Sequence, residues 1–451
     1  MTRKPRKCRS IGVWGSFVLF FTALTFVPFS TARAQHVSTV STGVSTTGTY
    51  SDNTSVTTGE KQSGFYWDLN PWVRYDFQAR NTNLGLMYSP SFRYYFDDRD
   101  HFLSHSLNLN AGHQLRKNLS TSFSNSLRIS QDPYDIPELV FERIEDDIII
   151  IEDPTLRTGR STYYSNNLRQ NFRYRFGPSD HVTLGYSFGF LKNDSPDYED
   201  SLNHGPNLGV TYWWTADYGT VFTASYRRGE FDESPSLNNY KANLRLIRKV
   251  SPTLRVFVEH GQNYVRYEGE NGLEERTAKR DYEVFDGNVG IDYDLTATTF
   301  MTLKGGVFYK QEDRGSSKTG FQLDGDLARQ FRRGSVRLSG GTGYDQAFFG
   351  AENLGFTQYY RGRILGTYAF TMRCSGNLSF QYQHNNFDQA DRKDDVYTFR
   401  SGLSYVFRPW LTGSVSYVHR MVESSIPNND YTENRVSVTL TAAPTIPFRF
   451  N

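Results

Sequence analysis

The stretch VTLGYSFGF, residues 182–190, decides the fold because apolar and small residues alternate along it without a break. Val182, Leu184, Tyr186, Phe188 and Phe190 would share one face of an extended chain, and threonine, serine and glycine would occupy the other. A period of two predicts a β-strand with one apolar and one polar face. About ten such residues are enough for a tilted strand to cross a bilayer.

The same alternation recurs along the chain, and counting the segments gives about 20 strands. The first segment, rich in Thr, Ser and Gly, has the weakest pattern, so 18 strands is the alternative. The expected strands are 36–50, 62–77, 83–96, 102–115, 119–131, 162–176, 181–192, 204–215, 219–230, 238–249, 253–268, 281–295, 299–311, 319–331, 335–346, 356–370, 376–388, 395–407, 411–423 and 432–442.

The connectors between these segments alternate in length. Short ones, such as 177–180, 216–218 and 408–409, are followed by longer polar ones, such as 193–203 and 231–237. Short turns on the periplasmic side and longer loops outside are typical of outer-membrane barrels. We therefore expect an all-β fold, a transmembrane antiparallel up-and-down β-barrel.

The first 34 residues read as a secretory signal peptide. A basic start is followed by an apolar run, and Ala32-Arg33-Ala34 places the expected cleavage near Ala34/Gln35. A single barrel then fills residues 35–451. Sec-type export to the cell outer membrane of a Gram-negative bacterium implies outer-membrane lipid and the barrel assembly machinery as partners, with periplasmic export partners as a further expectation.

The composition excludes several other classes of protein. The chain has 34 Phe, 30 Tyr and 37 Gly but a mean hydropathy of −0.60, as expected of a barrel that is wet inside. Without the leader the chain is slightly acidic, which argues against nucleic-acid binding. Only Cys374 remains after cleavage, so no internal disulfide is expected. The nine His are scattered, and no Gly-x-Ser-x-Gly elbow occurs. We expect no enzyme activity, no metal and no cofactor.

The polar face carries charges that identify the wet side of the wall. An arginine facing lipid at mid-membrane costs about 2–4 kcal/mol, so the polar face must line the lumen. The basic residues in phase with it are Arg74, Arg93, Arg128, Arg169, Arg173, Arg227, Lys241, Arg245, Lys304, Arg337, Arg361, Arg363, Arg400 and Arg420. The acidic ones are Asp286, Asp292, Asp324 and Asp326. Either these charges pair and merely keep the lumen hydrated, or they select an anionic solute.

The longest connector, 132–161, has an unusual composition. Four consecutive isoleucines, 148–151, lie among acidic residues. One hypothesis is that this loop folds inward and constricts the pore, and the alternative is an external hairpin that packs on neighbouring loops. The acids of the constriction hypothesis are Glu142, Glu145, Asp146, Asp147, Glu152 and Asp153.

The C-terminal residues resemble a known family. The turn 407–412 (FRPWLT) and the opening of the last strand, 428–436 (NNDYTENRV), are similar to outer-membrane β-barrel (porin-2-like) proteins associated with exopolysaccharide synthesis and export. The resemblance implies a conduit for a secreted polysaccharide. For such a conduit we expect Trp72, Tyr95 and Tyr359 to offer weak aromatic contacts in the lumen. The alternatives are a general or anion-preferring solute porin and a structural or adhesive surface barrel.

Overall fold

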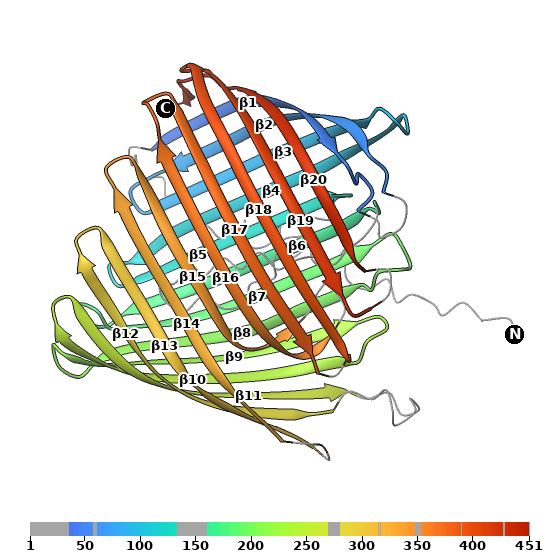
Figure 1. Cartoon of the computed structure of the whole chain (residues 1–451). Coiled ribbons are helices and arrows are strands. Elements are labelled where there is room, and N and C mark those ends of the chain that lie inside the picture. The colour runs from blue at the N-terminus through green and yellow to red at the C-terminus, as the bar shows by residue number, and fades with distance from the viewer. Residues whose placement is uncertain are drawn as a thin grey trace, which may run out of the picture.

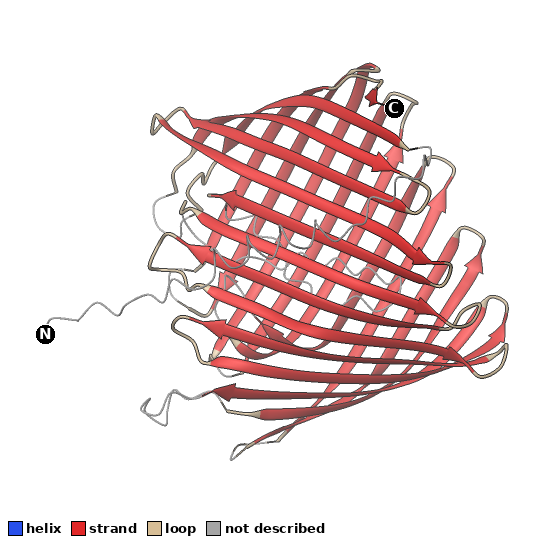
Figure 2. Cartoon of the chain, turned by 180° about the vertical axis from the view of Figure 1, so that it is seen from behind, coloured by secondary structure: helices blue, strands red, loops and turns tan. Residues whose placement is uncertain are grey.

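The computed structural model describes residues 36–56, 61–132, 160–268, 280–313, 315, 317–347, 353–388, 390–426 and 429–450. Within these ranges every regular element is a strand (Figure 2). No helix of this part of the chain is long and apolar enough to cross a bilayer. The expected signal peptide, residues 1–34, and the acids proposed for a constriction, Glu142 to Asp153, lie outside the described residues.

Twenty long strands and one short one make a single sheet. Their bounds are β1 Val37–Ser51, β2 Gly64–Gln78, β3 Thr82–Tyr95, β4 Asp100–Arg116, β5 Leu119–Ser130, β6 Tyr163–Arg175, β7 His181–Asn193, β8 Ser201–Trp213, β9 Tyr218–Phe231, β10 Ser236–Ser251, β11 Leu254–Glu268, β12 Tyr282–Thr296, β13 Thr299–Glu312, β14 Lys318–Phe331, β15 Gly334–Ala347, β16 Gly355–Ala369, β17 Cys374–Phe387, β18 Arg392–Arg408, β19 Leu411–Ser424, β20 Tyr431–Ala442 and β21 Phe448–Phe450.

Each long strand pairs antiparallel with the next one along the chain, and β1 pairs with β20 to close the barrel. Figure 1 shows the result, in which the tilted strands of the front wall cross those of the back wall. The predicted fold class and a count of 20 strands are confirmed, and the weakly patterned first segment is the strand that closes the sheet. The sequence missed β21, which follows Pro447 and pairs with Ser38–Val40 of β1.

The two faces of the sheet differ as the alternation predicts. Large apolar side chains such as Leu184, Val289 and Val307 are 56–62% exposed on the outer face. Their sequence neighbours point to the other side, where most of the charged side chains lie. Because hydrocarbon surrounds the outer face in a membrane, this exposure is expected of a spanning barrel.

Candidate functional site: the inner face of the barrel

The inner face is defined by the residues that alternate with the exposed apolar ones. By this alternation, all of the basic and acidic residues that the sequence assigns to the lumen fall on the inner face, from Arg74 of β2 to Arg420 of β19. Their role in passage stays a prediction. Their surroundings differ from one part of the wall to another.

We call the inner face of β5–β9 the basic wall. It carries Arg128, Arg169, Arg173, Arg175 and Arg227, and none of its inward strand positions is Asp or Glu. The remaining inward residues are mostly Ser, Asn, Thr and Gly. Arg169 lies directly opposite Ser187 and Ser124 in the neighbouring strands.

A proline interrupts the basic wall beside Arg227. Pro206 has no N–H to donate, and the ladder between β8 and β9 omits Gly205 and Pro206. A Cβ atom on Gly205 would lie 1.7 Å from the carbonyl oxygen of Tyr226, so only glycine fits there. The break borders a small recess, which is lined by Ser187, Pro206, Asn207, Ser225, Tyr226, Arg227 and Asn239.

We call the inner face of β10–β16 the paired wall, because its charges alternate in sign and are in contact. Glu259 of β11, which is 4% exposed, accepts from Arg245 Nε at 2.7 Å and lies 3.5 Å from Lys304 Nζ. Lys304 also lies 3.2 Å from Asp324, and Asp324 lies 4.0 Å from Arg361. The row therefore runs continuously from β10 to β16.

Two further ion pairs belong to the paired wall. Arg337 donates to Asp326 at 2.7 Å, and Arg255 lies 3.6 Å from Asp292. The sequence analysis missed Glu259, the most buried acid of this wall, although it is in phase with Asn263 and Phe257. The same alternation could have found it.

The remaining charges are also placed among partners. Arg93 of β3 donates to Asp68 at 2.7 Å and lies 3.2 Å from Asp132, between the rings of Tyr66 and Tyr95. Arg74 pairs with Asp76 at 2.8 Å, and both side chains are exposed. Arg400 of β18 and Arg420 of β19 face inward beyond the paired wall.

The loop-side ends of β15 and β16 form a second layer inside the barrel. Pairing between β14 and β15 stops at Leu323 and Thr342, although both strands continue. Beyond that point Phe356 and Tyr344 turn toward the inner face of β12 and β13. Tyr344 lies 5.0 Å from Phe308, and Phe356 lies 5.5 Å from Tyr282, centroid to centroid.

This inner layer encloses a core within the barrel wall. Its buried members are Leu237, Val265, Tyr267, Tyr282, Val284, Phe308 and Phe356. Gln346 Oε1 accepts from the hydroxyl groups of Tyr282 and Tyr267, and Gln346 Nε2 donates to Asn353 at 2.9 Å. Asn353 in turn donates to the carbonyl oxygen of Pro235 at 3.0 Å. We call residues 343–347 and 353–359 the inner hairpin.

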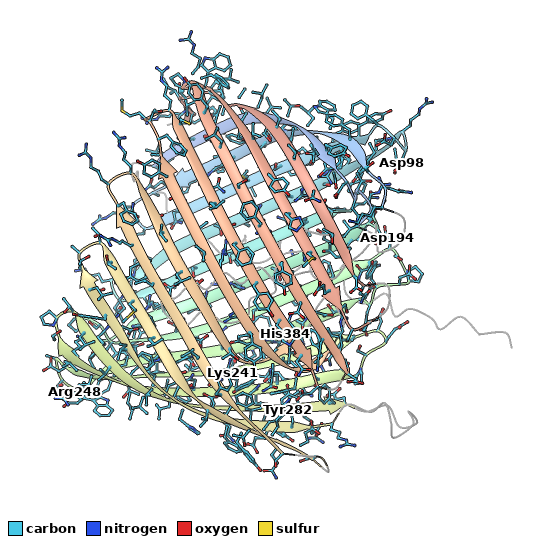
Figure 3. The ribbon with its side chains drawn as sticks, in the orientation of Figure 1. Asp98, Asp194, Lys241, Arg248, Tyr282 and His384 are labelled. Carbon is cyan, nitrogen blue, oxygen red and sulfur yellow. The ribbon has the colours of Figure 1, made fainter. Side chains whose placement is uncertain are left out.

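The inner hairpin was not predicted from the sequence. The alternation of β15 and β16 is regular, and nothing in it indicates that the two strands leave β14. Figure 3 labels Tyr282, one of the residues of this core, together with Lys241 of the neighbouring β10.

Among the described residues, no group of three or more His, Cys, Asp or Glu side chains is arranged to hold a metal ion. The inner face is polar. Its strand charges are all basic in β5–β9 and largely paired in β10–β16.

A closed antiparallel barrel with an apolar outer face and a charged inner face is a porin-type outer-membrane barrel. In agreement with this class, residues 233–443 match the family model described as "Putative beta-barrel porin 2". The match covers most of β10 to β20. No curated protein sequence matches the chain.

Several solved porins are similar in fold but distant in sequence. The outer membrane protein opdK from Pseudomonas aeruginosa is 12% identical, with a TM-score of 0.42 over 90% of this chain and 99% of that one. OccAB2 from Acinetobacter baumannii is 9% identical, with a TM-score of 0.40 over 91% and 98%. A BenF-like porin from Pseudomonas fluorescens Pf-5 is 10% identical, with a TM-score of 0.42 over 92% and 99%.

Proposed function

We propose that the barrel passes small anionic solutes, which move along the basic wall. The observation that carries this proposal is the contrast in charge on the inner face. Five arginines of β5–β9 share their wall with no acidic strand residue, whereas in β10–β16 Arg245, Lys304, Arg337 and Arg361 lie against carboxylates. A wall of one sign favours ions of the opposite sign, and a compensated wall does not.

The chemistry of the basic wall also suits passage rather than tight binding. Ser, Thr and Asn occupy most of the other inward positions of these strands and offer hydrogen bonds that water can replace. Arg227 at the recess beside Pro206 has Ser225 and Asn239 next to it, as a weak site for a carboxylate or phosphate. Conduction requires sites weak enough for a solute to leave, and a row of such groups meets that requirement.

Export of an acidic polysaccharide is the second candidate. It is favoured by the amide side chains of β8 and β10, because Asn203 and Asn239 have side-chain atoms without partners among the described residues and could bond sugar hydroxyls. The aromatic residues expected to contact sugars favour it less. Tyr95 is buried, and the guanidinium of Arg361 lies 4.3 Å above the ring of Tyr359. The third alternative, an adhesive surface barrel, requires no ion selectivity.

Ion selectivity in planar lipid bilayers tests the proposal. With a KCl gradient across the membrane, the reversal potential of the purified barrel is expected to indicate preference for chloride. The variant R128Q/R169Q/R173Q/R227Q should lose most of that preference. The matched control R245Q/E259Q/D326N/R337Q also changes four residues, but it removes two ion pairs without changing the net charge, and its selectivity should stay close to that of the parent.

Two outcomes would contradict the proposal: a parent barrel that prefers potassium, or an equal loss of selectivity in both variants. Deletion of the gene separates the candidates in cells. Loss of secreted polysaccharide with unchanged solute uptake would favour the second candidate, and loss of neither would favour the third.

A further inference from the structure

Six histidines of the barrel are held in the same way. In each, ring Nδ1 bonds to a group on an adjacent strand. The bonds are His105 with Tyr88 Oη at 2.8 Å, His113 with Thr82 Oγ1 at 2.7 Å, His204 with Tyr186 Oη at 3.1 Å, His260 with the Asp286 carbonyl at 2.9 Å, His384 with Asp395 Oδ1 at 2.9 Å and His419 with Asn434 Oδ1 at 2.8 Å.

All six lie on the outer face of the sheet. The pairing register places His204 opposite Phe188, His384 opposite Tyr360 and His419 opposite Phe399, which belong to the apolar, lipid-facing set. Figure 3 labels His384 on the wall that faces the viewer. In a membrane these imidazoles therefore meet lipid rather than the lumen.

Four of them lie toward the loop side of their strands. We call His105, His204, His384 and His419 the histidine belt. Three belt members contact tyrosine rings at 5.9–6.3 Å between centroids. The fourth, His419, shares the acceptor Asn434 Oδ1 with the hydroxyl of Tyr417. Tyrosine rings gather where hydrocarbon meets headgroups, so the belt lies at the level of the outer-leaflet headgroups.

The bonded ring leaves one nitrogen for a ligand. With Nδ1 occupied, Nε2 lies on the far side of the ring, and no hydrogen bond to it is found within the part of the chain that the structure describes for these four residues. Where the Tyr88 or Tyr186 hydroxyl donates to Nδ1, the neutral imidazole carries its proton on Nε2 and can donate it outward. His384 and His419 instead donate from Nδ1 to Asp395 Oδ1 and Asn434 Oδ1, so their Nε2 carries a proton only in the charged ring. A polar nitrogen facing hydrocarbon without a partner costs free energy, whereas a headgroup oxygen satisfies it.

A cation lies beside the belt at one position. Arg228 lies directly across from His204 on the outer face. Its guanidinium donates to Glu230 at 2.7 Å and to Glu268 at 2.7 Å, so two carboxylates already compensate its charge. The donor available to a headgroup at this position is therefore the His204 imidazole and not Arg228.

We propose that the histidine belt binds phosphate-bearing lipid headgroups of the leaflet on the loop side, with each ring aimed by its cross-strand bond. The proposal rests on the barrel spanning a membrane and does not depend on which solute it passes. It assigns the outer surface a partner of defined chemistry.

Lipid binding to the detergent-solubilised barrel tests the proposal. Native mass spectrometry would count bound molecules of phosphatidic acid, and of diacylglycerol, which lacks the phosphate. The parent is expected to bind phosphatidic acid several-fold better than diacylglycerol. The variant H105F/H204F/H384F/H419F keeps an aromatic ring at each position but loses the nitrogens, so this preference should fall close to one. The variant H105Q/H204Q/H384Q/H419Q keeps an N–H donor at each position and should retain part of the preference for phosphatidic acid.

The chain offers a matched control. His113 has the same bond geometry on the turn side, and His181 lies on the inner face, so H113F/H181F should leave phosphatidic acid binding unchanged. Retained preference in the four-phenylalanine variant would overturn the proposal, as would equal loss in the control. Competition by free inorganic phosphate, with no dependence on the acyl chains, would mean an ion site instead of a lipid site and would also overturn it.

Misfolding of the variant and a change in its oligomeric state are distinguished by two further measurements. If the four-phenylalanine variant does not fold, as judged by its heat-dependent shift on a gel, the single variant H204F should still halve the preference or more. If instead the substitutions convert an oligomer into a monomer with lipid binding unchanged, the belt is a contact between copies of the chain, which contradicts the proposal.

Discussion

The basic wall and the paired wall are built from the same strand pattern, yet they treat charge in opposite ways. In β5–β9 the arginines alternate with small residues and face no strand carboxylate. In β10–β16 Glu259, Asp324 and Asp326 are placed one strand away from a cation, and the inner hairpin covers the loop-side half. The inward strand charges of β5–β9 are therefore all positive. Those of β10–β16 largely pair with each other, on the side of the barrel that carries the inner hairpin.

The difference between the walls bears on a question that the sequence left open. Charges that pair with each other and charges that select a solute were alternatives for the whole lumen. The structure shows ion pairs in β10–β16, and selection of a solute along β5–β9 is our proposal.

Adding acids to the basic wall should abolish the contrast and have the largest effect. Ser120 lies opposite Arg173, and Ser124 lies opposite Arg169. Side chains at directly paired positions are about 5 Å apart, so S120D/S124D should create two ion pairs. We expect a several-fold fall in the chloride preference measured from the reversal potential. The isosteric control S120N/S124N should change it little, and an equal change in both variants would contradict the role of charge.

Releasing the inner hairpin should have the next largest effect. Gln346→Leu removes the acceptor of two buried tyrosine hydroxyls, and each unpaired hydroxyl costs about 1–3 kcal/mol. We expect a destabilised hairpin, a larger or less steady single-channel conductance and an unchanged ion preference. The control Asn108→Leu changes an amide on the inner face of β4, away from the hairpin. A conductance identical to that of the parent would show that the hairpin does not narrow the passage.

Glu259→Gln should have a smaller effect, on the heat stability of the barrel and on its preference for chloride. The substitution leaves Arg245 and Lys304 without their shared carboxylate. The cost is roughly 1–2 kcal/mol, because both cations are partly exposed and water can replace part of the lost interaction. We expect a lower temperature of heat-induced unfolding on a gel and a modest rise in chloride preference. Asp324→Asn, at a more exposed acid, should do less of both. A lower chloride preference would contradict the assignment of Glu259 to the lumen.

The sequence predicted the strands well because a bilayer imposes the same rule on each of them. Residues such as Leu184 and Val289 must alternate with polar ones wherever the wall separates lipid from water, and this local rule needs no knowledge of the partner strand. Even the weak first segment obeyed it. The short strand β21 escaped because three residues after Pro447 are too few to show a period.

The candidate site was predictable only in part. The alternation along a strand shows which face of the sheet a side chain lies on, but it does not show which side chains of other strands lie beside it. Arg245 and Arg169 look alike in the sequence, and only the register shows that one meets Glu259 and the other meets serines. The inner hairpin was beyond prediction for a related reason. Tyr344 and Phe356 keep their alternation, and it is the whole pair of strands that moves inside β14.

The smallest effect is expected at an ion pair that belongs to neither wall. Arg74 and Asp76 of β2 contact each other at 2.8 Å, but their side chains are 54% and 37% exposed. Water competes for both groups, so such a pair contributes about 0–1 kcal/mol. The double variant R74Q/D76N keeps the net charge and should leave both selectivity and heat stability within error of the parent. A clear loss of chloride preference in this variant would mean that Arg74 of β2 contributes to selectivity as the basic wall does. The selective sector would then extend from β5–β9 to β2.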